Sequence, residues 1–132
     1  MNKKETWFFD LDGTIFVYRQ FEQYAEEKAV LIDGITDFMN HIIKDGGCIV
    51  ITTARPEQLR EFTEQELQEN KIPYRFLLMG IERGARHLVN DSDADSNEPR
   101  ALAHPILRNE PMYEYLKRMR VLLDKIIKNA NS

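Results

Sequence analysis

The sequence predicts an α/β fold, a three-layer sandwich in which a parallel sheet of about five strands lies between two layers of helices. Short apolar runs alternate along the chain with longer segments whose apolar residues recur at helical spacing. Strands and helices that alternate in this way form right-handed crossovers, which produce a parallel sheet. A chain of 132 residues is long enough for one domain with a hydrophobic core, so we expect a single domain over residues 1–132.

Composition and charge narrow the classes of function. The 18 basic and 22 acidic residues give a net charge of −4, which argues against a protein that binds a nucleic-acid backbone. The single cysteine, Cys48, cannot form an intramolecular disulfide and is typical of a buried thiol in a reducing compartment. The chain shows no apolar stretch of the length that a signal peptide or a membrane span needs. We therefore expect a cytoplasmic protein without a membrane partner.

The first two predicted elements have clear sequence signals. Trp7–Phe9 is a short aromatic run that ends in Asp10, as expected for a strand buried on both faces. A helix is predicted to begin after Asp33 and to end at Gly46, because aspartate is a common N-cap and glycine commonly follows a helix. Five apolar residues share one face of this helix, namely Ile35, Phe38, Met39, Ile42 and Ile43.

A second strand and helix follow, and then a third strand. Cys48–Ile51 is an apolar run that ends in Thr52 and Thr53 and predicts a buried strand. Pro56 suits the first turn of a helix, which we expect to extend to about Asn70. The third strand is predicted at 74–78.

The last part of the chain is predicted to complete the sheet and add one helix. A fourth strand is expected at 87–89 and a fifth at 101–107, at an edge of the sheet because Pro105 lacks the N–H that a ladder needs. The final helix is expected to start near Pro111. Its predicted buried stripe consists of Met112, Leu116, Met119, Leu123 and Ile126.

Two aspartates directly follow the first predicted strand, in the stretch Asp10-Leu11-Asp12-Gly13-Thr14. Alternate residues of an extended chain share a face, so both carboxylates are expected to reach the crevice at the carboxyl end of the sheet. Two carboxylates that lie close together favour a cation between them, and oxygen ligands suit Mg²⁺. An ordinary Asp-Gly turn after a strand is the structural alternative.

The stretch from Asp10 to Thr14 resembles the first motif of the haloacid dehalogenase-like (HAD) phosphatases. In that family the first aspartate is the nucleophile and the second is the general acid and base, roles that would fall to Asp10 and Asp12. The resemblance extends to Thr53-Ala54-Arg55, which follows the second predicted strand as the family's second motif does. It implies that Thr53, Ala54 and Gly13 bind phosphate, with the Thr53 hydroxyl as part of the catalytic set.

The third motif departs from the family pattern, because no lysine lies between Met79 and Asn90. The cations there are Arg83 and Arg86, and a guanidinium also binds phosphate, although it is not equivalent to an ammonium. The spacing favours Arg83 as the phosphate-binding and catalytic cation, with Arg86 as the second choice. An ordinary surface charge is the alternative for each.

The fourth motif supplies acidic residues for the metal. Asp91 and Asp95 match its spacing, so the resemblance implies a Mg²⁺ site formed by Asp10, Asp12 through its backbone carbonyl, and Asp91. Asp95 would assist from the outer shell, and Asp93 competes for these roles. An EF-hand over 91–102 is rejected because Ser96 and Leu102 stand where that loop needs glycine and glutamate.

The resemblance as a whole implies a Rossmann-like, HAD-like fold without a cap domain, because the segments between motifs are too short to hold one. It predicts a Mg²⁺-dependent phosphatase that hydrolyses a phosphate monoester through an aspartyl-phosphate. The open site would take a small phosphorylated metabolite or a larger phospho-ligand, unless subunits of a homo-oligomer cover one another. The alternatives are an inactive relative that acts as a binding or regulatory module, and a phosphotransferase or mutase.

Overall fold

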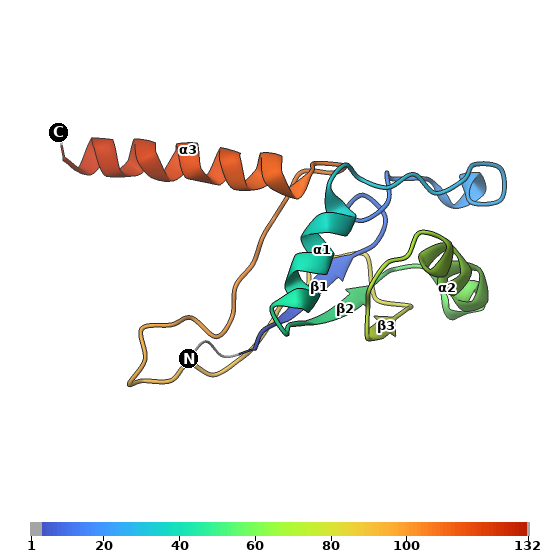
Figure 1. Ribbon diagram of the computed structural model, residues 1–132, viewed down its shortest axis with the longest axis horizontal. Coiled ribbons are helices and arrows are strands. Elements are labelled where there is room, and N and C mark those ends of the chain that lie inside the picture. Colours follow the sequence, from blue (N-terminus) through green and yellow to red (C-terminus); the bar gives the residue numbers. More distant parts are fainter. Residues whose placement is uncertain (1–3, 132) are drawn as a thin grey trace.

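The computed structural model describes residues 4–131 and contains a parallel sheet of three strands (Figure 1). β1 (Thr6–Asp10) lies beside β2 (Cys48–Thr52), and β2 lies beside β3 (Phe76–Leu78). The sheet order β1-β2-β3 follows the order of the chain. The first three predicted strands are therefore confirmed, each with bounds that differ from the prediction by one or two residues.

The helices between the strands cover only one face of this sheet. When strands follow one another across a sheet in chain order, right-handed crossovers place successive helices on the same face. Phe9, Ile51 and Leu77 form one cross-strand row on that face, and all three are buried. On the opposite face, Phe8 and Phe76 remain 55% and 54% exposed.

The two crossover segments contain the predicted helices. α1 (Ile35–Lys44) begins after Gly34, which has a φ of +77° and makes no side-chain cap, so Asp33 is not the N-cap that the sequence predicts. The second crossover starts with the 3₁₀ turn η2 (Glu57–Leu59) after Pro56, and α2 (Arg60–Glu69) follows. A further 3₁₀ turn, η1 (Phe21–Gln23), lies between β1 and α1.

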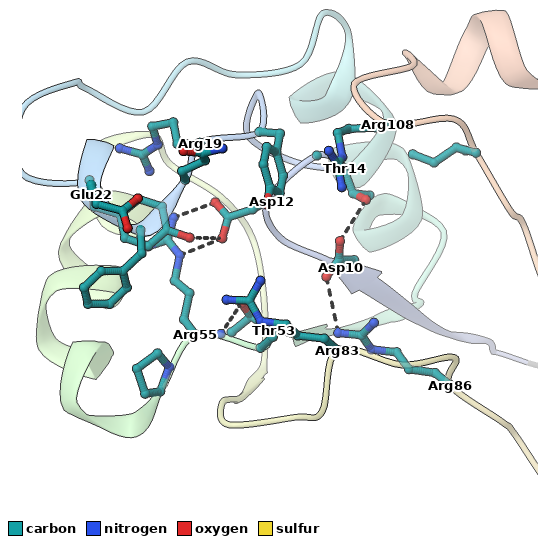
Figure 2. A pocket seen from close by; sticks show the side chains of 18 of the residues that line it. Asp10, Asp12, Thr14, Arg19, Glu22, Thr53, Arg55, Arg83, Arg86 and Arg108 are labelled. Carbon is teal, nitrogen blue, oxygen red and sulfur yellow. Dashed lines mark hydrogen bonds and ion pairs between the residues drawn. The ribbon is translucent and has the colours of Figure 1, made fainter.

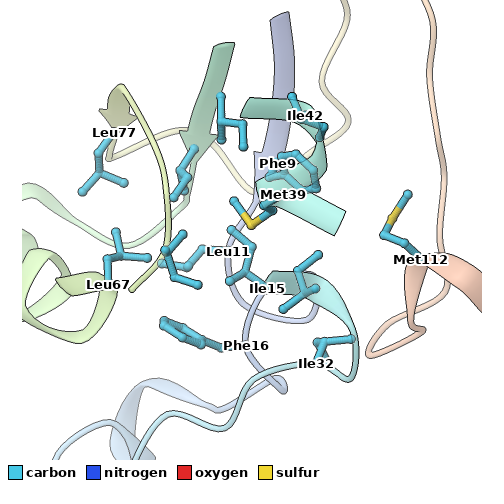
Figure 3. Packing of buried hydrophobic residues seen from close by; sticks show 14 of the residues in the cluster. Phe9, Leu11, Ile15, Phe16, Ile32, Met39, Ile42, Leu67, Leu77 and Met112 are labelled. Atoms are coloured by element: carbon cyan, nitrogen blue, oxygen red, sulfur yellow. The ribbon is translucent and has the colours of Figure 1, made fainter. Parts of the chain in front are cut away.

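The hydrophobic core lies between the sheet and these helices (Figure 3). Leu11, Ile15 and Phe16 follow β1 directly and are completely buried, so the chain folds back under α1 as soon as the strand ends. Met39 from α1 and Leu67 from α2 complete the same cluster. This burial fixes the turn that carries Asp10 and Asp12.

The prediction of a three-layer sandwich with about five strands is wrong. Within the described residues the sheet has three strands, and the segments at 87–89 and 101–107 are irregular. Val89 is 95% exposed and Leu102 is 60% exposed, so neither segment buries the apolar face that a strand needs.

The final helix forms as predicted but is not buried as predicted. α3 (Met112–Ala130) extends away from the sheet, and only Met112 and Tyr115 in its first turn are buried (Figure 1). Leu116, Leu123 and Ile126 of the predicted stripe are about half exposed. No helix among residues 4–131 has both the length and the apolar character to cross a membrane.

Candidate active site

A pocket of about 630 Å³ lies at the carboxyl ends of β1 and β2 (Figure 2). Parallel sheets place their binding sites at this edge, because the loops that follow the strands converge there. Seven residues that the sequence predicts for the site line this pocket, namely Asp10, Asp12, Gly13, Thr53, Ala54, Arg83 and Arg86. The side chains of Asp10 and Asp12 nevertheless turn to different partners.

Asp10 is the last residue of β1, and its carboxylate has only weak partners. Thr14 Oγ1 donates a hydrogen bond to Asp10 Oδ2 at 3.4 Å, and Arg86 Nη2 lies 3.5 Å from Oδ1. Burial raises the pKa of the Asp10 carboxyl above its usual range, while Arg86 and the backbone N–H of Leu11 oppose this shift. Asp10 is thus a partly desolvated carboxylate with lone pairs available, which suits a nucleophile.

Gly13 makes the turn that separates Asp12 from the rest of the pocket. Its φ is +91°, a conformation that strains residues with a Cβ. The backbone N–H of Asn109 donates to the carbonyl of Gly13 at 2.8 Å, and this brings the neighbouring Arg108 side chain against the glycine. A Cβ at position 13 would lie 3.3 Å from Arg108 Cγ, so glycine is needed both for the turn and for the close approach.

Asp12 is held in a bidentate ion pair with Arg55 rather than directed at Asp10. Arg55 Nη2 donates to Oδ1 at 2.8 Å and Arg55 Nε donates to Oδ2 at 2.9 Å. The hydroxyl of Tyr24 also donates to Oδ2, at 3.0 Å. Burial together with the Asp12 charge raises the pKa of Tyr24 to about 12, so this hydroxyl remains a donor at neutral pH.

Arg55 joins Asp12 to a buried network beneath the pocket. Its Nη1 donates to Glu66 Oε1 at 2.8 Å and to Thr63 Oγ1 at 3.0 Å, and Arg19 donates to both oxygens of Glu66. Burial alone would lower the pKa of Arg55, but the hydrogen bonds and charges of Asp12 and Glu66 raise it overall. Each charged side chain of the network, Asp12, Arg55, Glu66 and Arg19, is paired with an opposite charge, as burial requires.

Sequence reasoning assigned no role to Arg55, Glu66 or Arg19. Arg55 had one usable signal, its place directly after Thr53-Ala54 at a strand end. Glu66 and Arg19 had none, because a glutamate within a polar helix and an arginine in a loop both look like surface residues in sequence. Only the fold shows that both are buried.

Three arginines outside the buried network, Arg83, Arg86 and Arg108, contribute positive charge to the pocket (Figure 2). Arg86 faces Asp10, and within residues 4–131 neither Arg83 nor Arg108 forms an ion pair. The guanidinium of Arg108 stacks on the Tyr18 ring, with 3.9 Å between the guanidinium carbon and the ring centroid. Arg108 was not among the predicted site residues, since it follows the edge strand expected at 101–107 and belongs to none of the motifs.

The hydroxyl of Thr53, which the second motif assigns to phosphate binding, contacts the backbone of its own turn. Thr53 is buried, and its Oγ1 accepts a hydrogen bond from the backbone N–H of Arg55 at 3.1 Å. This bond closes the turn after β2 and orients the start of the Arg55 side chain. Thr53 and Ala54 still line the pocket, so a bound anion would meet the polar groups of this turn.

The predicted metal ligands Asp91 and Asp95 do not line the pocket. The Asp91 side chain is 82% exposed, and its carboxylate lies 4.0 Å from the guanidinium of Arg100. The competing Asp93 caps its own loop by accepting a bond from the backbone N–H of Asp95. The part of the chain that the structure describes contains no cluster of three or more His, Cys, Asp or Glu side chains suited to a metal ion.

The residues present therefore do not fit the expected Mg²⁺ site. Magnesium needs several oxygen ligands in near-octahedral geometry. Of the expected ligands, Asp10 and Asp12 line the pocket, whereas Asp91 does not, so Asp10 is the one expected carboxylate ligand left there. The predicted site fails because it relied on a fourth strand to carry Asp91 to the sheet edge, and residues 87–89 do not form one.

Comparisons with known proteins add little to this geometry. Neither a scan of protein-family models nor a search of curated proteins finds a match. Among solved structures, the chain is similar to a structural-genomics target from Vibrio cholerae, with a TM-score of 0.49 and 15% sequence identity over 92% of this chain and 98% of that one. A similarity at this level carries no argument, so function is inferred from the residues of the pocket.

The buried network predicts a large effect for Glu66→Gln on stability. The substitution removes the charge that faces both Arg19 and Arg55, and breaking a buried ion pair from one side costs about 3–5 kcal/mol. Urea unfolding should therefore show a loss of this size. Glu69→Gln on the exposed side of α2 is the matched control and should change stability by less than about 0.5 kcal/mol. Equal effects would contradict the buried network.

Proposed function

We propose that this chain is a phosphatase that hydrolyses a phosphate monoester through an aspartyl-phosphate on Asp10. The observation that carries the proposal is the charge around this carboxylate. Five arginines and three acidic side chains line the pocket, so its lining has an excess of two positive charges (Figure 2). This excess matches a phosphate monoester, which carries close to −2 at neutral pH. The resemblance of the Asp10–Thr14 stretch to the HAD phosphatases gives independent support.

In the first step, an oxygen of Asp10 would attack phosphorus while the bond from phosphorus to the ester oxygen breaks. The electron pair of that bond leaves with the ester oxygen, which departs as an alkoxide or phenolate and takes its proton from water, and the phosphoryl group becomes an acyl phosphate on Asp10. The guanidiniums would bind the equatorial oxygens and offset the repulsion between two anions. Positive charge fixed in place in this way stabilises the transition state without rearrangement of solvent.

In the second step, water would attack the phosphoryl group and Asp10 would leave as a carboxylate. Asp12 would accept the proton of that water, and for this it must give up one of the hydrogen bonds that its oxygens accept from Arg55 and Tyr24. The same contacts oppose its other expected role, because they occupy the oxygens through which a general acid would donate to the leaving group.

A requirement for magnesium rests on the resemblance alone, since the described residues of the pocket do not bring together the side-chain ligands that would hold the ion. The sequence predicts that excess chelator abolishes turnover and that Mg²⁺ restores it. The sequence assigns Asp91 as a ligand, but its exposed position outside the pocket predicts that Asp91→Ala changes the Mg²⁺ concentration required no more than Asp37→Ala on the exposed side of α1 does. Full turnover in excess chelator, measured as released inorganic phosphate, would show that the arginines suffice.

Asp10→Asn tests the nucleophile directly. An amide cannot form the acyl phosphate, so phosphate release should fall to background, while Asp37→Asn should leave it unchanged. The raised pKa of Asp10 means that its ionised form destabilises the fold, an effect that is absent below the unfolded pKa near 3.8 and develops as pH rises. Asp10→Asn should therefore raise the melting temperature at pH 7 and lose this advantage in acid. Substantial turnover by Asp10→Asn would refute the covalent mechanism.

Because Asp12 is paired with Arg55, we expect kcat/KM to depend strongly on the leaving group. A positioned general acid usually contributes about 10²–10⁴-fold, and the pair with Arg55 withholds that contribution. The wild-type chain should therefore have a kcat/KM at least about 100-fold higher for a nitrophenyl phosphate than for a simple alkyl phosphate. Equal values would show that Asp12 leaves Arg55 and delivers a proton during turnover.

A second candidate, an anion-binding module without catalytic activity, is favoured by one observation. The pairing of Asp12 with Arg55 and the distant position of Asp91 leave the arginines as the best-formed part of the pocket. Such a module would bind a phosphorylated ligand through Arg83, Arg86 and Arg108 without releasing phosphate. Phosphate binding by calorimetry, measured beside the turnover assay, separates the two candidates. Phosphate acceptors added to that assay would detect a phosphotransferase.

A further inference from the structure

Two apolar surfaces of this chain lack a cover, and they differ in shape. The first is the sheet face opposite α1 and α2, where Phe8, Phe76 and Leu78 are each about half exposed. The second is one side of α3 beyond its first turn, which carries Leu116, Leu122, Leu123, Ile126 and Ile127. At 100° per residue these five side chains fall within a single stripe, and Val121 lies on the opposite side of the helix.

The open sheet face is incomplete as protein architecture. Parallel sheets have both faces covered, because their strands are apolar on both sides. Here the order β1-β2-β3 puts both crossover helices on one face, so nothing in the order of the strands supplies a cover for the other. A helix with an apolar stripe is the element that ordinarily fills this place.

α3 has such a stripe, but its own chain holds it away from the sheet (Figure 1). Met112 and Tyr115 anchor its first turn in the core, and Tyr113 donates a hydrogen bond to Asp33 at 3.0 Å beside the start of α1. Met119 still packs against the core, and beyond it the helix extends away from the body of the molecule. A helix fixed at this end presents its stripe to another molecule.

We propose that the chain forms a two-fold dimer in which the α3 stripe of each subunit covers the open sheet face of the other. The dimensions agree. Residues 116–127 of α3 span roughly 18 Å at 1.5 Å per residue, and a five-residue strand such as β1 spans roughly 17 Å. Three adjacent strands give a width of roughly 10 Å between the outer two, which is close to the diameter of one helix.

The area that becomes buried is also sufficient. The eight half-exposed apolar side chains of the two surfaces each leave roughly 90 Å² in water, or on the order of 700 Å² per subunit. A two-fold dimer would then bury on the order of 1,400 Å², within the range of about 1,200–2,000 Å² for stable interfaces. A contact between the two α3 helices alone would bury less and would leave both sheet faces uncovered.

The distribution of charge favours binding of α3 to the rest of the partner subunit over packing of two α3 helices against each other. α3 carries five basic and two acidic residues, whereas the rest of the chain carries 13 basic and 20 acidic residues. The helix is therefore positive and the body to which it would bind is negative, and these charges attract. Two α3 helices side by side would instead bring like charges together.

The test measures the mass of the full chain by sedimentation across a range of concentrations. The wild type should be a dimer, and Leu123→Glu should weaken dimerisation by at least about 100-fold, since it places a charge in the apolar contact. Val121→Glu, on the opposite side of the same helix, is the matched control and should remain dimeric. A monomeric wild type, or equal effects of these two variants, would overturn the proposal.

A complementation experiment identifies the surface that α3 covers. Phe76→Glu should also be monomeric, because it places a charge in the apolar sheet face. If circular dichroism shows that Phe76→Glu loses structure, Phe8→Glu takes its place in the experiment. Leu123→Glu keeps an intact sheet face and Phe76→Glu keeps an intact stripe, so an equimolar mixture should associate through one intact contact. That contact buries on the order of 700 Å², so the association should be weaker than in the wild type and visible at the highest concentrations. If Phe76→Glu and Phe8→Glu both remain dimeric, or if the mixture associates no more than either variant alone, α3 does not cover the sheet and the proposal fails.

Discussion

The bidentate ion pair between Arg55 and Asp12 is the interaction on which the pocket depends. Asp12 follows β1 and Arg55 follows β2, so the pair joins the two loops that form the pocket. Glu66 from α2 holds the other side of the same guanidinium, which ties the crossover helix to the site. A buried guanidinium donates hydrogen bonds from more than one edge, and each of these edges needs an anionic acceptor. Asp12 accepts at one edge of Arg55 and Glu66 accepts at another. The position of Asp12 is therefore set by stability as well as by chemistry.

This arrangement divides the two aspartates by environment. Asp12 has strong partners at both oxygens, whereas Asp10 has two long contacts and a raised pKa. Two carboxylates one residue apart can have different roles only if their surroundings differ in this way. The turn at Gly13, with its positive φ, directs the chain after Asp12 towards Arg108. Backbone geometry and charge thus separate a candidate nucleophile from a candidate proton acceptor.

The handedness of the crossovers has consequences at both ends of the molecule. It puts α1 and α2 on one face, where their burial fixes the loop after β1 and hence the site. The same rule leaves the other face bare and apolar, and α3 carries a matching stripe away from its own sheet. A site built at the edge of so small a sheet depends on the stability of that sheet. Covering its second face would therefore strengthen the scaffold that holds Asp10.

Sequence by itself determined the elements whose signals are local. The strands around Phe8, Val50 and Leu77, the three α-helices and the position of Asp10 and Asp12 at one edge follow from periodicity and strand ends. The resemblance to a known family added Thr53, Arg83 and Arg86, which also line the pocket. What sequence did not determine depends on partners distant in the chain. A strand at 87–89 requires a neighbour to pair with, and the burial of Glu66 requires Arg19 and Arg55. The direction of the Asp12 side chain was likewise decided by Arg55, 43 residues away. Only tertiary structure settles such features, because a charge or an apolar run has the same local signal whether or not a partner exists.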